Sequence, residues 1–120
     1  MHTQTAINAR VLVVEDDEGI AQLIRFILEA EGYEVHWAAD GLAALDCMAR
    51  LAPPALVTLD IGLPHVPGDE IARRIRVTPG WEAVPIVMIT ATPSEDAALE
   101  FLQKPFKPAE LRSLAQRLIG

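Results

Sequence analysis

The chain has 120 residues, the length of one ordinary domain, of which 51% are hydrophobic and 22% charged. This composition is typical of a folded globular protein and argues against a disordered one. Acidic residues outnumber basic ones by 17 to 10 and the net charge is -7, so we expect no direct nucleic acid binding, which needs a basic surface.

The cysteine content and the hydropathy pattern predict a cytoplasmic protein without membrane segments. Cys47 is the only cysteine and has no partner for an intrachain disulfide, which favours a reducing compartment. No apolar run approaches the roughly 20 residues that cross a bilayer, and the N-terminal stretch lacks the apolar segment of a signal peptide. We expect residues 1–9 to form a flexible arm and residues 10–120 to form one domain.

Short apolar runs rich in β-branched residues alternate with helical periodicities along the chain. This pattern predicts a parallel sheet with crossover helices. Strands are predicted at residues 11–14, 33–38, 55–60 and 85–90, with a short fifth strand at 100–103.

Helices are predicted after the first three strands and after the last one. Gly32 ends the first helix, Pro53 and Pro54 end the second, and Asp69 or Gly68 lies near the cap of the third. The last helix spans residues 108–119. The apolar residues at helical spacing are Ile20, Leu23, Ile24, Ile27 and Leu28 in the first helix, Leu42, Leu45, Met48 and Ala49 in the second, Ile71 and Ile75 in the third, and Leu111, Leu114, Leu118 and Ile119 in the last.

Five strands with alternating helices imply a doubly wound α/β domain with helices on both faces of the sheet. In such sheets, ligands bind outside the carboxyl ends of the strands. Polar residues stand at these ends, and we expect them to converge on one rim: Glu15 and Asp16 after the first strand, Asp60 after the third, Thr90 on the fourth, and Lys104 past the fifth.

Such a group of side chains has a definite chemical use. Three neighbouring carboxylates raise one another's pKa values unless a cation joins them, and oxygen ligands of this kind suit Mg²⁺. A carboxylate can attack phosphorus to form an aspartyl phosphate. Lys104 and the Thr90 hydroxyl would then hold the phosphoryl oxygens.

Each of these residues alone has an ordinary interpretation. An acid at a strand end is usually a solvated loop residue or a helix cap, and we prefer that interpretation for Asp40 and for Asp69. Thr90 alone would bond the backbone, and Lys104 alone would be a surface charge. Asp17 is expected to cap the first helix and Glu18 to lie in its first turn, where the helix dipole favours acids.

Taken together, the motifs resemble the receiver domain of two-component response regulators, a CheY-like superfamily. Glu15 and Asp16 match the family's acidic pair, Asp60 in "LDIGLP" its phosphorylated aspartate, Thr90 in "MITA" its hydroxyl residue and Lys104 in "KPF" its lysine. The motifs occur in the family's order and the resemblance covers nearly the whole chain. It implies the flavodoxin-like strand order 2-1-3-4-5.

By this resemblance, Asp60 accepts a phosphoryl group from a phosphohistidine on a sensor histidine kinase or histidine phosphotransfer domain. Mg²⁺ would be held by Asp16, Asp60 and the backbone carbonyl of Gly62, with Glu15 reaching it directly or through water. The domain would act on a downstream protein target as a monomer or weak dimer. It would not be a turnover enzyme.

Two departures from the family pattern stand out. Gly62 replaces the larger side chain that is common two residues after the phosphorylated aspartate, which leaves the site more open to water. The crossover before the fifth strand, residues 91–100, is also short, close to the minimum for a parallel connection. Thr92, Pro93 and Glu95 spell a helix start there, so we expect one or two turns instead of a full fourth helix.

Two further features follow from the resemblance. The Lys104–Pro105 peptide bond matches one that is usually cis in the family. Phe101 falls at the position of an aromatic residue that turns inward when Thr90 moves toward the phosphoryl group. An equally good interpretation is that Phe101 is simply a core aromatic.

Three functions remain open at this point. The leading hypothesis is a phosphorylation-operated signalling switch. The alternative is a pseudo-receiver that binds proteins without phosphorylation, which the short crossover favours and the intact Asp60, Thr90 and Lys104 disfavour. A Mg²⁺-dependent phosphohydrolase ranks last, because Gly62 stands where that class carries its second acid.

Overall fold

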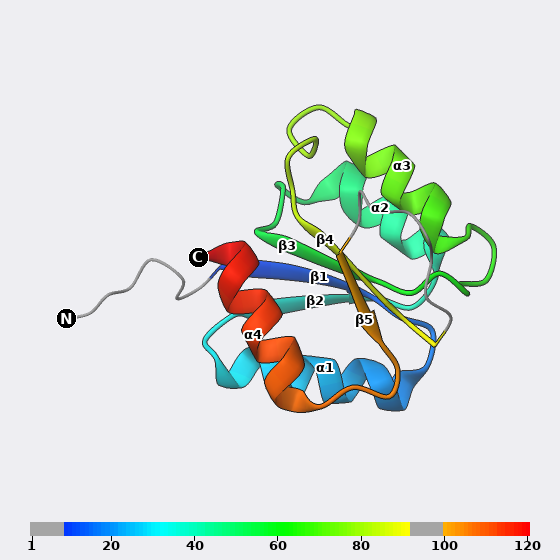
Figure 1. Ribbon diagram of the computed structural model, residues 1–120. Coiled ribbons are helices and arrows are strands. Elements are labelled where there is room, and N and C mark those ends of the chain that lie inside the picture. The colour runs from blue at the N-terminus through cyan, green and yellow to red at the C-terminus, as the bar shows by residue number, and fades with distance from the viewer. Residues whose placement is uncertain (1–8, 92–99) are drawn as a thin grey trace.

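The computed structural model describes residues 9–91 and 100–120, which form one parallel sheet with helices on both faces (Figure 1). The strands are β1 (Arg10–Val14), β2 (Glu34–Ala38), β3 (Leu56–Leu59), β4 (Ile86–Thr90) and β5 (Glu100–Gln103). The helices of this part of the chain are α1 (Glu18–Ala30), α2 (Gly41–Arg50), α3 (Gly68–Val77) and α4 (Pro108–Ile119). The sheet order, β2-β1-β3-β4-β5, confirms the predicted fold class and strand order.

Two predicted segments lie outside the described residues. They are the short helix expected to begin at Thr92 and all but the last residue of the expected arm at 1–9. Both therefore stay predictions. Within the described ranges, no helix is long and apolar enough to pass through a membrane.

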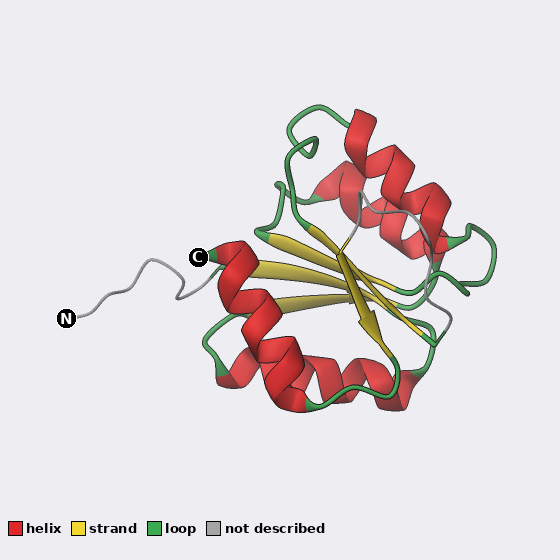
Figure 2. Cartoon of the chain, viewed as in Figure 1, coloured by secondary structure: helices red, strands yellow, loops and turns green. Residues whose placement is uncertain are grey.

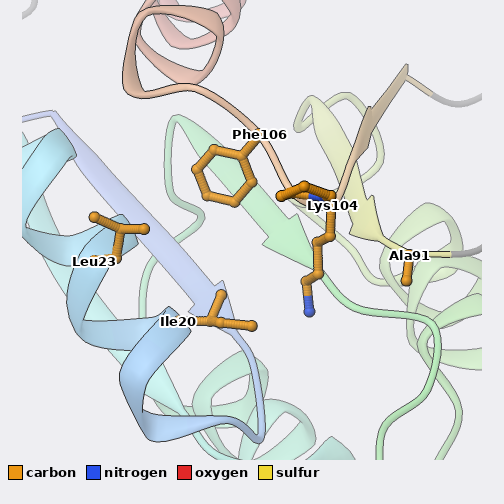
Figure 3. A pocket seen from close by; sticks show the side chains of 6 residues that line it. Ile20, Leu23, Ala91, Lys104 and Phe106 are labelled. Carbon is orange, nitrogen blue, oxygen red and sulfur yellow. The ribbon is translucent and has the colours of Figure 1, made fainter.

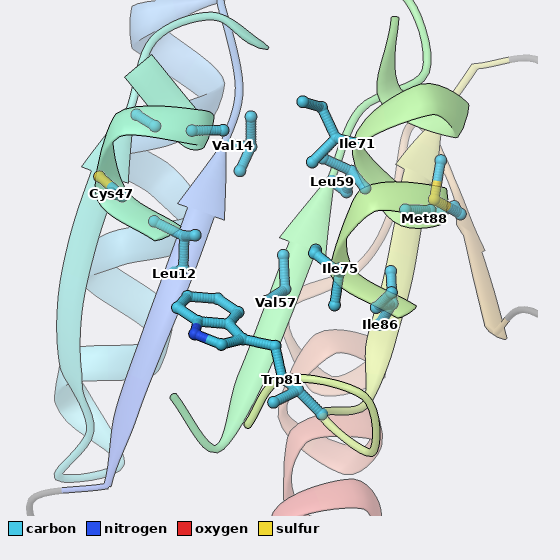
Figure 4. Packing of buried hydrophobic residues seen from close by; sticks show 14 of the residues in the cluster. Leu12, Val14, Cys47, Val57, Leu59, Ile71, Ile75, Trp81, Ile86 and Met88 are labelled. Carbon is cyan, nitrogen blue, oxygen red and sulfur yellow. The ribbon is translucent and has the colours of Figure 1, made fainter. Parts of the chain in front are cut away.

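The two faces of the sheet carry two separate apolar layers, because neighbouring residues of a strand point to opposite faces. Leu12 and Val57 belong to the layer under α2 and α3, whereas Val11 and Val13 belong to the layer under α1 and α4. Figure 2 shows the two helix pairs on either side of the strands. In Figure 4, Trp81 packs at the amino-terminal end of the strands, opposite the end that carries the polar residues.

Side-chain caps begin the first two helices, as the sequence predicts. Asp17 accepts a hydrogen bond from the Ile20 backbone N–H at 3.0 Å, and Glu18 lies in the first turn of α1. Asp40 caps α2 by accepting from the Ala43 N–H at 2.8 Å. Two of the chain's acids thus have structural roles.

The apolar face predicted for the second helix is confirmed only in part, because Leu45 and Met48 pack against the layer under α2 and α3 but Leu42 and Ala49 are exposed. The buried residues of α2 are Gly41, Ala44 and Cys47. The predicted residues are exposed or only partly buried, namely Leu42, Leu45, Met48 and Ala49. Small side chains let the α2 backbone lie close to its neighbours, since a Cβ on Gly41 would overlap Val66. The buried face of α2 is therefore the one whose small residues let the helix backbone approach its neighbours closely, and not the one with the most large apolar residues.

Gly68, predicted near the cap of the third helix, directly follows the N-cap of α3, which Pro67 occupies without a side-chain hydrogen bond. Gly68 begins the helix, and its N–H donates to the Ile61 carbonyl at 3.0 Å. A Cβ on Gly68 would overlap the Asp60 carbonyl. The start of α3 is therefore held by contact with the end of β3.

We expect Gly68→Ala to lower the free energy of unfolding by about 1–3 kcal/mol, because the added methyl group forces the α3 start away from Asp60. The matched control is Gly62→Ala, since no atom lies within 4 Å of the added Cβ there. Its stability should stay within about 0.5 kcal/mol of the parent protein in urea denaturation. Equal losses in the two variants would contradict this account.

Thr58 is a polar residue in the apolar layer under α1 and α4. It pairs in register with Val13 and Val87, which belong to that layer, and it is 1% exposed. Its hydroxyl finds no hydrogen-bond partner among the described residues. A buried hydroxyl without a partner costs free energy, so Thr58 weakens the fold where a valine would not.

Thr58→Val should raise the free energy of unfolding by about 1 kcal/mol, because it removes this buried hydroxyl with little change of shape. The reverse substitution at the next position, Val57→Thr, should lower stability by about 1–3 kcal/mol, since Val57 is fully buried. Urea denaturation measures both. A loss of stability in Thr58→Val would show that the hydroxyl has a partner.

Candidate functional site

The polar residues predicted to converge do lie together at the carboxyl end of the sheet. Glu15 and Asp16 follow β1, Asp60 follows β3, Thr90 ends β4 and Lys104 follows β5. One carboxylate oxygen from each of the three acids lies within 4.8 Å of the others. Parallel pairing brings these ends to one edge, since β1 pairs with β3, β3 with β4 and β4 with β5.

Glu15 is the most buried acid of the group, with 1% of its surface exposed. Its Oε1 accepts a hydrogen bond from Lys104 Nζ at 2.8 Å, and its Oε2 accepts from the Asp17 N–H at 3.1 Å. Burial raises the pKa of Glu15, while the bonds from Lys104 and Asp17 partly offset this rise. The carboxyl group is therefore held in one orientation.

Lys104 joins two of the carboxylates. Its Nζ donates to Glu15 Oε1 at 2.8 Å and to Asp60 Oδ2 at 3.2 Å. Burial alone would lower the pKa of Lys104, but the two carboxylates raise it above its usual value. The backbone N–H of Lys104 donates to the Thr90 carbonyl at 2.9 Å, and the Lys104–Pro105 bond is cis, as the sequence motif implies.

Hydrogen bonds hold both the backbone and the side chain of Asp60, which is partly exposed. Its backbone N–H donates to the Val14 carbonyl at 3.1 Å, and its Oδ1 accepts from the Gly62 N–H at 3.2 Å. Gly62 leaves open space beside it, because nothing lies within 4 Å of the place of a Cβ. A reactant can thus approach the Asp60 carboxylate from this side.

Thr90 and Phe101 occupy the two strands beyond Asp60. Thr90 is 5% exposed and ends β4 at the rim. Phe101 pairs in register with Met88 and packs, partly buried, against the layer under α2 and α3. This packing agrees with the interpretation of Phe101 as a core aromatic, and its role in switching stays a prediction.

The donor set of the rim fits a hard divalent cation. All the ligand atoms offered by Glu15, Asp16 and Asp60 are carboxylate oxygens, which Mg²⁺ and Ca²⁺ prefer. Asp16 is exposed and Asp60 is half-buried, so a hydrated ion can reach them. Against these three acids, the described rim offers one side-chain cation, Lys104, which leaves negative charge for a metal to balance.

The sequence did not point to Trp37, which contacts this site from the neighbouring strand. Its indole Nε1–H donates to the backbone carbonyl of Glu15 at 2.8 Å. Trp37 stands at the second-last position of β2, and an alternating strand pattern says nothing about where an indole N–H points. Only the three-dimensional arrangement reveals this contact.

A pocket of about 340 Å³ opens beside Lys104, between the first turns of α1 and the segment after β5 (Figure 3). Ile20 and Leu23 line it on one side and Pro105 and Phe106 on the other. Leu23, predicted on the apolar face of the first helix, is 43% exposed at this edge. An apolar pocket therefore lies directly beside the polar group of Glu15, Asp16, Asp60 and Lys104.

Comparison with known proteins shows which family the chain is similar to. The family model of the response regulator receiver domain matches residues 11–116. The DNA-binding response regulator MtrA of Mycobacterium tuberculosis (strain ATCC 25618 / H37Rv) is 38% identical over 110 residues, which cover 85% of this chain and 46% of that protein. The phosphate regulon transcriptional regulatory protein PhoB of Rhizobium meliloti is 37% identical over 119 residues, 92% of this chain and 52% of that protein. The chain thus spans about half the length of these curated relatives.

Solved structures give the same result. The receiver domain of the sensor histidine kinase PA1611 from Pseudomonas aeruginosa, which has magnesium coordinated in its active-site cleft, is 31% identical with a TM-score of 0.85, covering 94% of this chain and 98% of that one. The chemotaxis response regulator CheY4 of Vibrio cholerae is also 31% identical with a TM-score of 0.85, covering 92% and 98%.

We expect Lys104→Met to lower the free energy of unfolding at pH 7 by about 2–3 kcal/mol, because Glu15 then stays buried without its cation. The loss is below that of a fully buried pair because the rim is open. This loss of stability should become smaller as the pH falls through the pKa of Glu15, which burial holds above its usual value. The reason is that the folded variant then binds a proton at Glu15, which removes the unpaired buried charge.

Two further variants make this measurement specific. Glu15→Gln combined with Lys104→Met removes both charges and should recover most of the lost stability in urea. Arg50→Met breaks an exposed pair with Asp46 and should leave stability nearly unchanged. A double variant as unstable as Lys104→Met would show that the cation does not act through Glu15.

Proposed function

Because this chain belongs to the response regulator receiver domain family, we propose that it is a phosphorylation-dependent signalling switch in which Asp60 accepts the phosphoryl group. One observation carries the proposal. The partly exposed Asp60 carboxylate accepts hydrogen bonds from the Gly62 N–H and from Lys104 Nζ at the edge where the other two acids converge.

The geometry supports a direct transfer to Asp60. A carboxylate oxygen of Asp60 attacks the phosphorus of a phosphohistidine, the P–N bond breaks, and the histidine ring leaves with its electron pair. Lys104 is already within hydrogen-bond distance of Asp60 and can bind a phosphoryl oxygen without moving far. The Thr90 hydroxyl, at the end of the adjacent strand, would bind another.

Magnesium fits the acids of the rim. Asp16 and Asp60, the Gly62 carbonyl and, directly or through water, Glu15 would hold it, and magnesium is what the PA1611 receiver domain holds in its cleft. When bound, the ion would neutralise the charge on the transferring phosphoryl oxygens. Lys104 partly offsets the rise that burial causes in the Glu15 pKa, and its hydrogen bond holds the Glu15 carboxylate in place.

The proposed partners follow from the same chemistry. The phosphodonor is a sensor histidine kinase or a histidine phosphotransfer domain in the cytoplasm, and the output is a downstream protein target. Several relatives are named as DNA-binding, but this chain spans about half their length, and its charge of -7 disfavours nucleic acid contact by the domain itself. A switch of this kind is a phosphoacceptor and does not turn over substrates.

Phosphorylation would act through the β4 and β5 strands. The Lys104 N–H donates to the Thr90 carbonyl, so a displacement of Thr90 at the end of β4 would also displace Lys104 after β5, and the reverse. Charge added at Asp60 would bias two packings of this region, with Thr90 and Phe101 as the residues that report it. Gly62 leaves the phosphoryl group open to water, which favours a short-lived phosphorylated state.

The test is intact mass after incubation with Mg²⁺ and acetyl phosphate. The protein should gain a phosphoryl adduct that a chelator prevents and that Asp60→Asn abolishes, because the nucleophile is then missing. Asp69→Asn is the matched control and should keep the adduct, since Asp69 is an exposed acid in the first turn of α3.

Other outcomes would favour the other functions. If the parent protein gains no adduct and beryllium fluoride also fails to bind, the domain is a pseudo-receiver that acts without phosphorylation. Continuous release of phosphate from phosphoesters would instead point to a hydrolase.

A further inference from the structure

The hydrogen bond from Trp37 to Glu15 lies where the regular pairing of β1 and β2 has ended. The last residues paired in register are Val14 and Ala38. Beyond them, the Glu15 N–H still donates to the Ala38 carbonyl at 3.1 Å, and the Glu15 carbonyl accepts from the Trp37 indole at 2.8 Å. The peptide groups on both sides of Glu15 are therefore tied to β2.

This second bond acts on both acids of the pair, because a peptide group is planar. The Glu15 carbonyl shares one plane with the Cα atoms of Glu15 and Asp16. A donor that fixes the direction of this carbonyl thus fixes the plane from which both side chains leave. These are two of the three residues whose carboxylate oxygens lie within 4.8 Å of one another.

The indole is itself held in place. Trp37 pairs in register with Val13, so its ring lies on the α1 and α4 side of the sheet, where it packs, partly buried, against the apolar layer. A donor on a ring fixed by core packing loses little freedom when it makes its bond. Outer-shell partners that hydrogen-bond metal ligands directly typically change metal affinity 10–100-fold when they are lost. Trp37 bonds the backbone between two ligand residues, so we expect an effect at the low end of this range.

We propose that Trp37 is a positioning residue of the phosphoryl site: its indole N–H orients the Glu15–Asp16 peptide and thereby sets the affinity for Mg²⁺. This inference rests on the proposed function, since it concerns the metal that Asp60 phosphorylation would use. The Trp37 N–H bonds the Glu15 backbone carbonyl, so Trp37 would act on the metal ligands through the backbone.

Two substitutions separate the N–H from the ring. Trp37→Phe keeps an aromatic ring and removes the donor, and Trp81→Phe makes the same change at the other tryptophan, which is 2% exposed at the opposite end of the sheet. The thermal unfolding midpoint measured against Mg²⁺ concentration gives the dissociation constant of each variant. We expect about ten-fold weaker binding in Trp37→Phe and an unchanged constant in Trp81→Phe.

A third variant removes the effect of lost packing. Benzothienylalanine at position 37 has the shape of tryptophan with sulfur in place of the N–H, and it should bind Mg²⁺ as weakly as Trp37→Phe. Tryptophan fluorescence gives a second measurement. In Trp81→Phe, Trp37 is the only tryptophan, and adding Mg²⁺ should change its fluorescence emission. In Trp37→Phe, the remaining Trp81 should show no such change.

The outcomes distinguish this inference from the proposed function. If the parent protein binds Mg²⁺ but Trp37→Phe or the benzothienyl variant binds it equally well, the indole N–H does not position the site and the inference is overturned. If the parent protein itself shows no response to Mg²⁺, the magnesium-dependent function fails first and the inference falls with it.

Discussion

The site depends on the hydrogen bonds that the ammonium group of Lys104 donates to two carboxylates. The ammonium group lies between Glu15 and Asp60 and so joins the ends of β1, β3 and β5, three segments far apart in the sequence. An ionised Glu15 with 1% exposure would be costly without this partner. The cation also keeps Asp60 facing the open edge of the sheet, so the same contact serves both the fold and the chemistry.

Much of the fold and the rim could be predicted from the sequence because strand ends are local features. The run before Glu15 and the run before Asp60 are short and apolar, and parallel pairing then leaves no other place for the acids. Asp17 and Asp40 were recognisable as caps because a cap depends on residues three positions away.

Features that depend on tertiary contacts were missed or misread. The buried face of α2 follows from the fit of Gly41 against Val66, and the start of α3 from the fit of Gly68 against Asp60. Neither fit is visible in helical periodicity. Trp37 was missed for the same reason, since its donor bonds a backbone carbonyl 22 positions away in the chain.

The distance in sequence between Glu15 and Lys104 has a consequence for the synthesis of the protein. These partners are separated by 89 positions, and β5 is the last of the five strands of this sheet in chain order. Until Lys104 has emerged and β5 has paired with β4, a growing chain has the Asp60 carboxylate but lacks the cation beside it. The group formed by Glu15, Asp60 and Lys104 is therefore complete only once all five strands of the sheet have paired.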